Sequence, residues 1–162
     1  MTGRIIVLGG AGQLGRAAAQ AFQGAGWRVA SLARGSSAAG ALPGTEIVEV
    51  DARDAASVVA AASGADVVLH ALNVAYTEWE RFAVPFAETA IAAARENRAT
   101  LVFPGNLYNF GAGMPAWIDE TAAPHPTSRM RASMATRIAP LREVGCGAAV
   151  SSIQAGMPAP KL

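Results

Sequence analysis

Three regularly spaced glycines are the residues of this chain whose pattern points most directly to chemistry. Gly9, Gly12 and Gly15 stand three residues apart in the stretch Gly-Gly-Ala-Gly-Gln-Leu-Gly. The first glycine permits a tight turn, the second lets backbone amides approach a pyrophosphate, and the third permits close packing of a following helix. Gln13 and Leu14 fall in the first turn of that helix, whose positive end attracts phosphates, so the pattern predicts a dinucleotide site. A merely flexible turn is the alternative.

One pair of polar residues could also take part in a reaction. Asn106 and Tyr108 follow the apolar run at residues 100–103. The Asn106 amide could polarise a carbonyl group and the Tyr108 hydroxyl could donate a proton, although both residues also suit a structural loop. The only histidines, His70 and His125, are well separated in the sequence, so we expect no metal site.

These residues need a scaffold, and the hydrophobic pattern predicts strands that alternate with helices. Apolar and β-branched runs predict strands at residues 4–8, 27–32, 46–50, 66–70, 100–103 and 148–153. Helical spacing predicts helices at residues 13–24, 54–62, 78–98 and 128–143. Pro85 is expected to kink the third of these helices or to mark the first turn of its main part. The stretches 35–44 and 106–127 are rich in loop-forming residues, and we expect loops there.

This alternation predicts an α/β fold, a doubly wound parallel sheet of the Rossmann type. Right-handed crossovers place helices on both faces of such a sheet. The strand order 3-2-1-4-5-6 would open a ligand crevice at the carboxyl ends of the first and fourth strands. At 162 residues the chain is expected to form a single domain over residues 1–162.

The chain resembles the extended and atypical short-chain dehydrogenase/reductase superfamily, in particular its NAD-dependent epimerase/dehydratase and NmrA-like branches. The likeness extends over nearly the whole chain. It is carried by the glycine motif, Leu32-Ala-Arg34, Asp51-Ala-Arg-Asp54, Asp66-Val-Val-Leu-His-Ala-Leu-Asn73 and Phe103-Pro-Gly-Asn-Leu-Tyr-Asn-Phe-Gly111.

The resemblance implies how the adenosine end of an NAD(P) cofactor would be held. Asp51 would hydrogen-bond the adenine amino group, and the backbone of Ala52 would cover the ring. A helix cap is an equal alternative for Asp51 or Asp54. Arg34 stands where NADP-binding relatives place a guanidinium on the ribose 2′-phosphate, and no acidic residue ends the second strand to bind a 2′-hydroxyl. NADP is therefore favoured, with NAD left open and a solvated arginine as the alternative.

At the other end of the cofactor, the resemblance places Ala71, Leu72 and Asn73 beside the nicotinamide ribose. His70, just before them, is expected to pack within its strand. The segment that holds Tyr108 looks like the one that carries the active-site hydroxyl in relatives.

The chain departs from the family in its catalytic residues. Relatives use a Tyr-x-x-x-Lys pair, but Tyr76 is followed four residues later by Glu80, Tyr108 by Ala112, and the single lysine is Lys161. The chain also lacks the length of the substrate domain that extended members add. Two functions remain: an NAD(P)-dependent oxidoreductase or epimerase-like enzyme acting on a small carbonyl or sugar compound, and a non-catalytic NAD(P)-binding sensor of the NmrA-like kind.

Charge and composition restrict the partners. The net charge is +1, and the sequence has no run of lysine or arginine, so neither nucleic acid nor a membrane surface is expected to bind. No apolar run has a membrane-spanning length, and we expect a cytoplasmic protein. A small-molecule substrate is expected if the chain is an enzyme. A second copy of the chain is one of the candidates to cover its incomplete substrate pocket.

Overall fold

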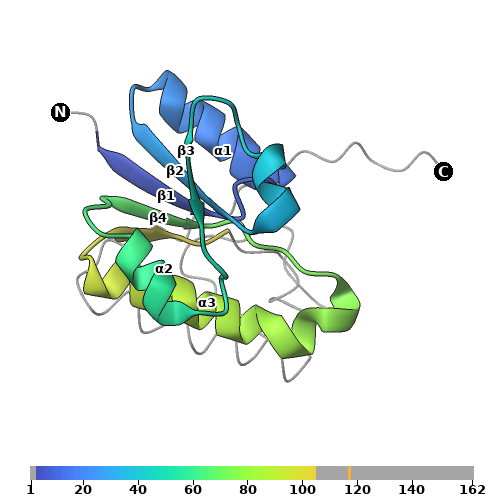
Figure 1. The fold of residues 1–162 in the computed structure, drawn as a ribbon. Helices are drawn as coiled ribbons and strands as arrows, with labels where there is room; N and C mark the ends of the chain where they lie inside the picture. The colour runs from blue at the N-terminus through green and yellow to red at the C-terminus, as the bar shows by residue number, and fades with distance from the viewer. Residues whose placement is uncertain (1–2, 105–116, 118–162) are drawn as a thin grey trace.

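A computed structural model describes residues 3–104 and 117, and within them the fold is a parallel sheet flanked by helices (Figure 1). The strands lie in the order β3-β2-β1-β4-β5. Their bounds are β1 Arg4–Leu8, β2 Arg28–Ala33, β3 Glu46–Glu49, β4 Val67–His70 and β5 Thr100–Val102. The helices are α1 Gln13–Gly24, α2 Ala55–Ala61 and α3 Trp79–Glu96, with short 3₁₀ helices η1 Gly35–Gly40 and η2 Tyr76–Glu78. This architecture confirms the predicted doubly wound α/β fold.

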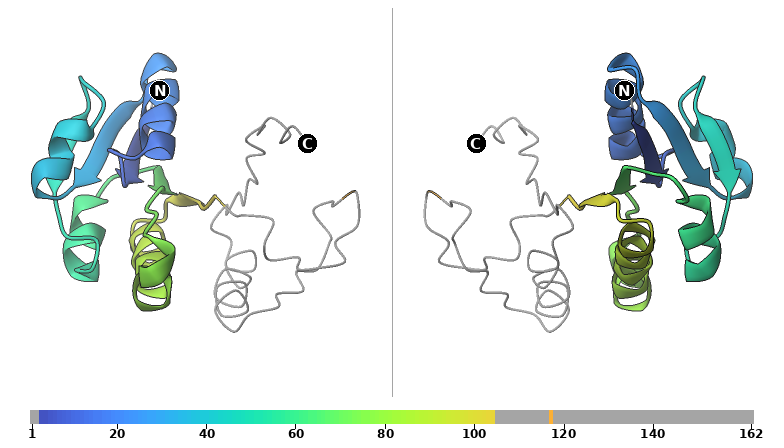
Figure 2. Two further views of the ribbon diagram at one scale, coloured as in Figure 1. Left: turned by 90° about the vertical axis from the view of Figure 1, so that its right-hand side faces the viewer. Right: turned by 90° about the vertical axis from the view of Figure 1, so that its left-hand side faces the viewer.

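The sheet buries both of its faces because its central strands are apolar at successive positions. Alternate residues of a strand point to opposite faces, so Ile5 and Val7 of β1 pack on the α1 side, while Ile6 and Leu8 join the core under α2 and α3. Figure 2 shows α1 on one side of the sheet, with α2 and α3 on the other. Two hydrophobic cores therefore hold the layers together.

Local sequence accounts for most element boundaries. The helix expected at residues 13–24 is α1, and the glycines near residue 24 end it; Gly26 has φ +81°. The expected helix cap at Asp54 is present, since its side chain accepts a hydrogen bond from the Ser57 amide at the start of α2. The helix predicted at residues 128–143, the strand at 148–153 and most of the loop at 106–127 lie outside the described residues.

One expectation about local structure was wrong. The first part of the loop expected at residues 35–44 forms η1, because six residues are enough for a short 3₁₀ turn even when they are all Gly, Ser or Ala. α3 runs from Trp79 through Pro85, so the proline does not mark the first turn of the helix, and a kink at Pro85 stays a prediction. Proline has no amide hydrogen, so the Arg81 carbonyl one turn earlier receives no helical hydrogen bond from Pro85. Both residues are exposed, and water can hydrate that carbonyl.

The strand register brings the carboxyl ends of the strands to one edge of the sheet. Leu8 pairs with Leu32 of β2 on one side and with His70 of β4 on the other. All the pairings between these strands are parallel, so the segments that follow β1, β2, β3 and β4 leave the sheet at the same edge. The sequence motifs follow these four strands.

Candidate functional site

The glycine motif forms a tight turn from β1 into α1. The Gly12 amide donates a hydrogen bond to the Gly9 carbonyl oxygen at 3.0 Å, and Gly9 has φ +87°, a conformation that favours glycine. A Cβ atom at Gly15 would lie 2.2 Å from the same oxygen and 2.9 Å from the Cα of Gly10. The absence of a side chain at Gly15 therefore lets the first turn of α1 rest directly on the β1 turn.

The start of α1 has features that fit an anion. Its cap residue, Gly12, has no side chain to bind the first amides, and its first turn holds no acidic residue. Gly12 is exposed, and among the described residues a Cβ atom there would meet only the Gly9 oxygen within 4 Å, at 3.4 Å. Uncapped amides, a positive helix end and open space fit a pyrophosphate group.

The glycine turn lies against the segment that follows β4. The Ala71 amide donates a hydrogen bond to the Leu8 carbonyl oxygen at 2.8 Å. A Cβ atom at Gly9 would lie 2.8 Å from the Ala71 oxygen and 3.0 Å from the Leu72 nitrogen. Asn73 is exposed beyond them. The structure therefore brings together the glycines and the segment expected to pass the nicotinamide ribose.

Arg34 and Asp51, predicted separately as cofactor ligands, form an ion pair. Arg34 Nη1 lies 3.2 Å from Asp51 Oδ2. Arg53 donates to both oxygens of the same carboxylate, from its amide at 3.0 Å and from Nε at 2.9 and 3.0 Å, and its Nη2 also contacts Oδ2. The hydrogen bonds from Arg53 hold the pKa of Asp51 well below its usual range, and the same contact raises the pKa of Arg53.

Arg53 and η1 also lie at this edge, although the sequence pattern did not predict either of them as part of the site. Arg53 stands two residues after Asp51, and that short spacing was the available signal. η1 approaches the glycine turn because Arg16 Nη1 donates a hydrogen bond to the Gly40 carbonyl at 3.2 Å, and a Cβ atom at Gly40 would lie 3.2 Å from the Ala11 Cβ. No feature of the sequence alone predicted that contact.

Two buried polar side chains lie near the same edge. Ser31 of β2 is fully buried below the glycine turn, and its Oγ has no hydrogen-bond partner among the residues that the structure describes. His70, at the end of β4, is buried as expected and stacks on Phe103 at 4.5 Å between ring centroids; within residues 3–104 and 117 its Nε2 has no hydrogen-bond partner. Burial lowers the pKa of His70 to about 4, so its ring is neutral near pH 7.

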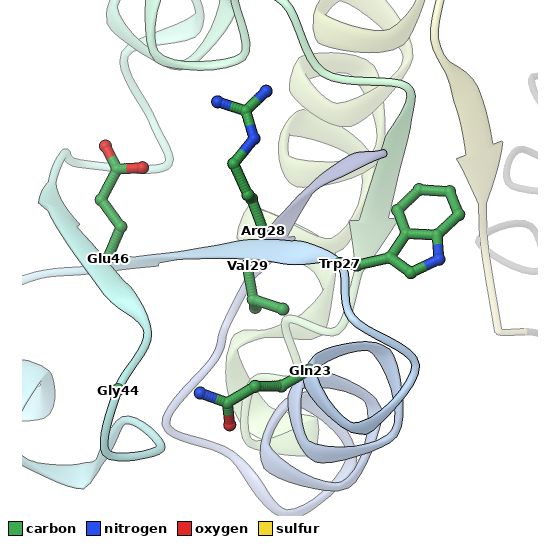
Figure 3. Close-up of a pocket in the computed structure, with 6 residues that line it drawn as sticks. All are labelled: Gln23, Trp27, Arg28, Val29, Gly44 and Glu46. Atoms are coloured by element: carbon green, nitrogen blue, oxygen red, sulfur yellow. The ribbon is translucent and has the colours of Figure 1, made fainter. Parts of the chain in front are cut away.

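A surface hollow of about 380 Å³ lies at the opposite edge of the sheet (Figure 3). It is lined by residues from the end of α1 and the first residues of β2 and β3, among them Gln23, Arg28 and Glu46. In Figure 3, Arg28 and Glu46 rise from one side of the sheet, while Gln23 lies on the other with Val29. Because cofactors of this fold bind at the carboxyl edge, this hollow is separate from the candidate site.

Metal sites and membrane-spanning helices can be sought only among the described residues. Among residues 3–104 and 117, no cluster of three or more potential metal ligands occurs, and no helix is both long and apolar enough to cross a membrane. Asn106 and Tyr108 lie outside the described residues, so their proposed roles stay predictions.

Comparison with known proteins identifies the family and the fold. A family model described as NAD(P)H-binding matches residues 9–138. No curated protein matches the chain. Solved structures with a similar fold include UDP-glucose 4-epimerase from Brucella ovis in complex with NAD, with a TM-score of 0.71 and 22% identity over 91% of this chain and 50% of that one.

Two further enzymes share this fold. UDP-N-acetylglucosamine 4-epimerase from Bacillus cereus has a TM-score of 0.69 and 18% identity, with 91% of this chain and 57% of that one covered. Uronate dehydrogenase from Agrobacterium tumefaciens has a TM-score of 0.66 and 18% identity, with 89% and 57% covered. The chain thus spans about half the length of these proteins, and at this identity the likeness establishes the fold.

Proposed function

Because the chain belongs to the NAD(P)H-binding family, we propose that it binds NADP across the carboxyl ends of β1 and β4 as an oxidoreductase or epimerase-like protein. The observation that carries this proposal is the start of α1 on the glycine turn, which has no side-chain cap and has open space at Gly12 in the described part of the chain. In this arrangement the pyrophosphate lies on the amides around Gln13 and Leu14, and Gly9 and Gly15 keep the turn compact.

The other cofactor-binding residues lie along the carboxyl edge on both sides of the glycine turn. Arg34 faces the ribose 2′-phosphate, and Ala52 covers the adenine ring. Both oxygens of Asp51 already accept hydrogen bonds from arginine side chains, so a bond to the adenine amino group would replace one of them. At the other end, the backbone of Ala71 and Leu72, with Asn73, lies beside the nicotinamide ribose.

Cofactor binding is tested by placing a side chain in the open space. Gly12→Val should abolish most NADP affinity in calorimetry, because its methyl groups would occupy the space of the pyrophosphate. Gly24→Ala is the control, because Gly24 lies at the far end of the same helix and no described residue would come within 4 Å of the added methyl group. Parental affinity in Gly12→Val would show that the site is misplaced.

Selectivity for NADP is a separate part of the proposal. A charged hydrogen bond from Arg34 to the 2′-phosphate should contribute about 1.5–3 kcal/mol, or roughly ten- to a hundredfold in affinity over NAD. Calorimetric titration of the parent chain with each cofactor measures this ratio. Equal affinities would remove Arg34 from cofactor selection and leave NAD as an equal ligand.

For catalysis, we propose reduction of a small carbonyl or sugar compound, with the bound nicotinamide supplying hydride. Tyr108 would donate a proton and Asn106 would polarise the carbonyl. Without a neighbouring lysine, a tyrosine keeps its proton near neutral pH and acts better as an acid than as a base. The absence of Tyr-x-x-x-Lys favours the second function, a non-catalytic NAD(P) sensor.

Turnover separates the two functions. In the enzyme, Tyr108→Phe should lower carbonyl-dependent cofactor oxidation by about 10²–10⁴-fold while leaving NADP affinity unchanged. Parental turnover in this variant would exclude Tyr108 from the mechanism. If the parent binds NADP but does not oxidise NADPH in the presence of any carbonyl compound tested, the result would support the sensor.

A further inference from the structure

The charged side chains after β2 and β3 form a compact group at the carboxyl edge. Asp51 accepts hydrogen bonds from Arg34 and Arg53, which follow different strands. These strands are neighbours: the Val50 amide donates to the Ala33 carbonyl oxygen at 3.2 Å, directly before both segments diverge. The group is therefore fixed to the sheet at its base.

Stability alone gives little reason for this group. Its side chains are 66% exposed at Arg34, 52% at Arg53 and 33% at Asp51. Ion pairs this exposed contribute little to stability, because water and salt screen them. The group instead brings two guanidinium groups, from segments that follow different strands, onto one carboxylate at this edge.

Arg53 also retains hydrogen-bonding capacity. Every hydrogen bond of its side chain in the described part of the chain goes to Asp51, from Nε and Nη2. A guanidinium carries five N–H donors in a planar fork, so Nη1 keeps two donors for another acceptor. Asp51 stays ionised and Arg53 stays protonated over the neutral range, since each shifts the pKa of the other in that direction.

We propose that Arg53 is a second determinant of NADP selectivity, binding the ribose 2′-phosphate together with Arg34 while Asp51 holds its guanidinium at the sheet edge. This inference rests on the proposed function. A phosphate dianion has acceptor oxygens for two guanidinium groups, and two of these outweigh the repulsion from one carboxylate that they already neutralise. Asp51 is a positioning residue in this arrangement, because it acts on the phosphate only through the arginines.

The test compares both cofactors in matched variants. Arg53→Met should lower NADP affinity about tenfold and leave NAD affinity within twofold, because only NADP carries the 2′-phosphate. Arg53→Lys keeps the charge and should recover part of the loss. Arg28→Met, an exposed arginine at the opposite edge, should change neither affinity. Unfolding transitions of all variants check that each one folds.

The positioning role of Asp51 has its own readout. In an Asp51→Asn background, Arg53→Met should change NADP affinity by less than twofold, because the guanidinium is no longer held in place. An undiminished effect of Arg53→Met in that background would contradict positioning by Asp51. Unchanged NADP affinity in Arg53→Met alone would overturn the inference about Arg53 while leaving the proposed site intact. A parent chain that binds neither cofactor would overturn the proposed function itself.

Discussion

A Cβ atom at Gly15 would lie 2.2 Å from the Gly9 carbonyl oxygen, whereas in the described part of the chain one at Gly12 would meet only that oxygen, at 3.4 Å. The two glycines therefore have different structural roles. Gly15 is required by the packing of the protein on itself, and Gly12 leaves space for a ligand. Substitutions at the two positions should consequently separate folding from binding.

Gly15→Ala is expected to destabilise the fold by about 1–3 kcal/mol, because the added methyl group overlaps backbone atoms that cannot move without shifting the turn. Gly24→Ala places the same methyl group in open space at the end of α1 and should be neutral or stabilise by up to about 1 kcal/mol. Chemical denaturation of the two variants measures both effects. Equal stabilities would show that the turn adapts to a side chain at Gly15.

His70 should make stability depend on pH. Burial lowers its pKa from 6.5 to about 4, so between these values the unfolded chain binds a proton that the folded chain does not. The stability associated with neutral His70 is fully present above about pH 6.5 and is lost as pH falls toward 4, by up to about 3 kcal/mol. Denaturation midpoints at pH 7.5 and pH 4.5 should differ accordingly.

His70→Leu is the matched control, since leucine packs against Phe103 without titrating. Its stability should vary less with pH in this range than that of the parent. If parent and variant lose the same stability between pH 7.5 and 4.5, other groups cause the loss.

At the scale of elements, α2 depends on its first residue. It is a short helix of 7 residues, and isolated helices of that length are unstable in water. The Asp54 carboxylate accepts a hydrogen bond from the Ser57 amide at 3.2 Å, and hydrogen bonds from Ser57 lower the pKa of Asp54. A charged cap at the positive helix end therefore supports an element that lies beside the charged group at Asp51.

Asp54→Ala should lower the free energy of unfolding by about 1 kcal/mol near pH 7, because the first amides of α2 lose their acceptor. Asp54→Ser keeps a capping oxygen and should retain most of the stability. Urea denaturation of the two variants gives the comparison. An alanine variant as stable as the serine variant would mean that the cap contributes nothing.

At the scale of the whole molecule, cofactor binding should appear as added stability. A ligand that binds only the folded state at a hundred times its dissociation constant stabilises that state by about 2.7 kcal/mol. Thermal unfolding of the parent should therefore shift to higher temperature as NADP is added, and Gly12→Val should show no shift. A shift of equal size in both proteins would place NADP away from the glycine turn.

Local sequence determined the parts of the fold that depend on neighbouring residues. The apolar run from Ile5 to Leu8 is buried wherever it stands in a parallel sheet, so it predicted β1 without tertiary information. The glycine spacing similarly predicted the turn into α1, because it reflects steric limits within seven residues. The Asp54 cap was predictable for the same reason, since donor and acceptor lie three residues apart.

The tertiary structure decided the features that depend on which strands are neighbours. Arg34 and Asp51 lie 17 positions apart, and only the placement of β3 beside β2 makes them a pair, with Arg53 as its third member. Ile47 belongs to a β-branched run typical of burial, yet it is 46% exposed on β3, which has only β2 as a neighbour in the described sheet. Strand order and register arise from packing over the whole domain, and they set the charge and exposure at the sheet edges where a short sequence pattern cannot.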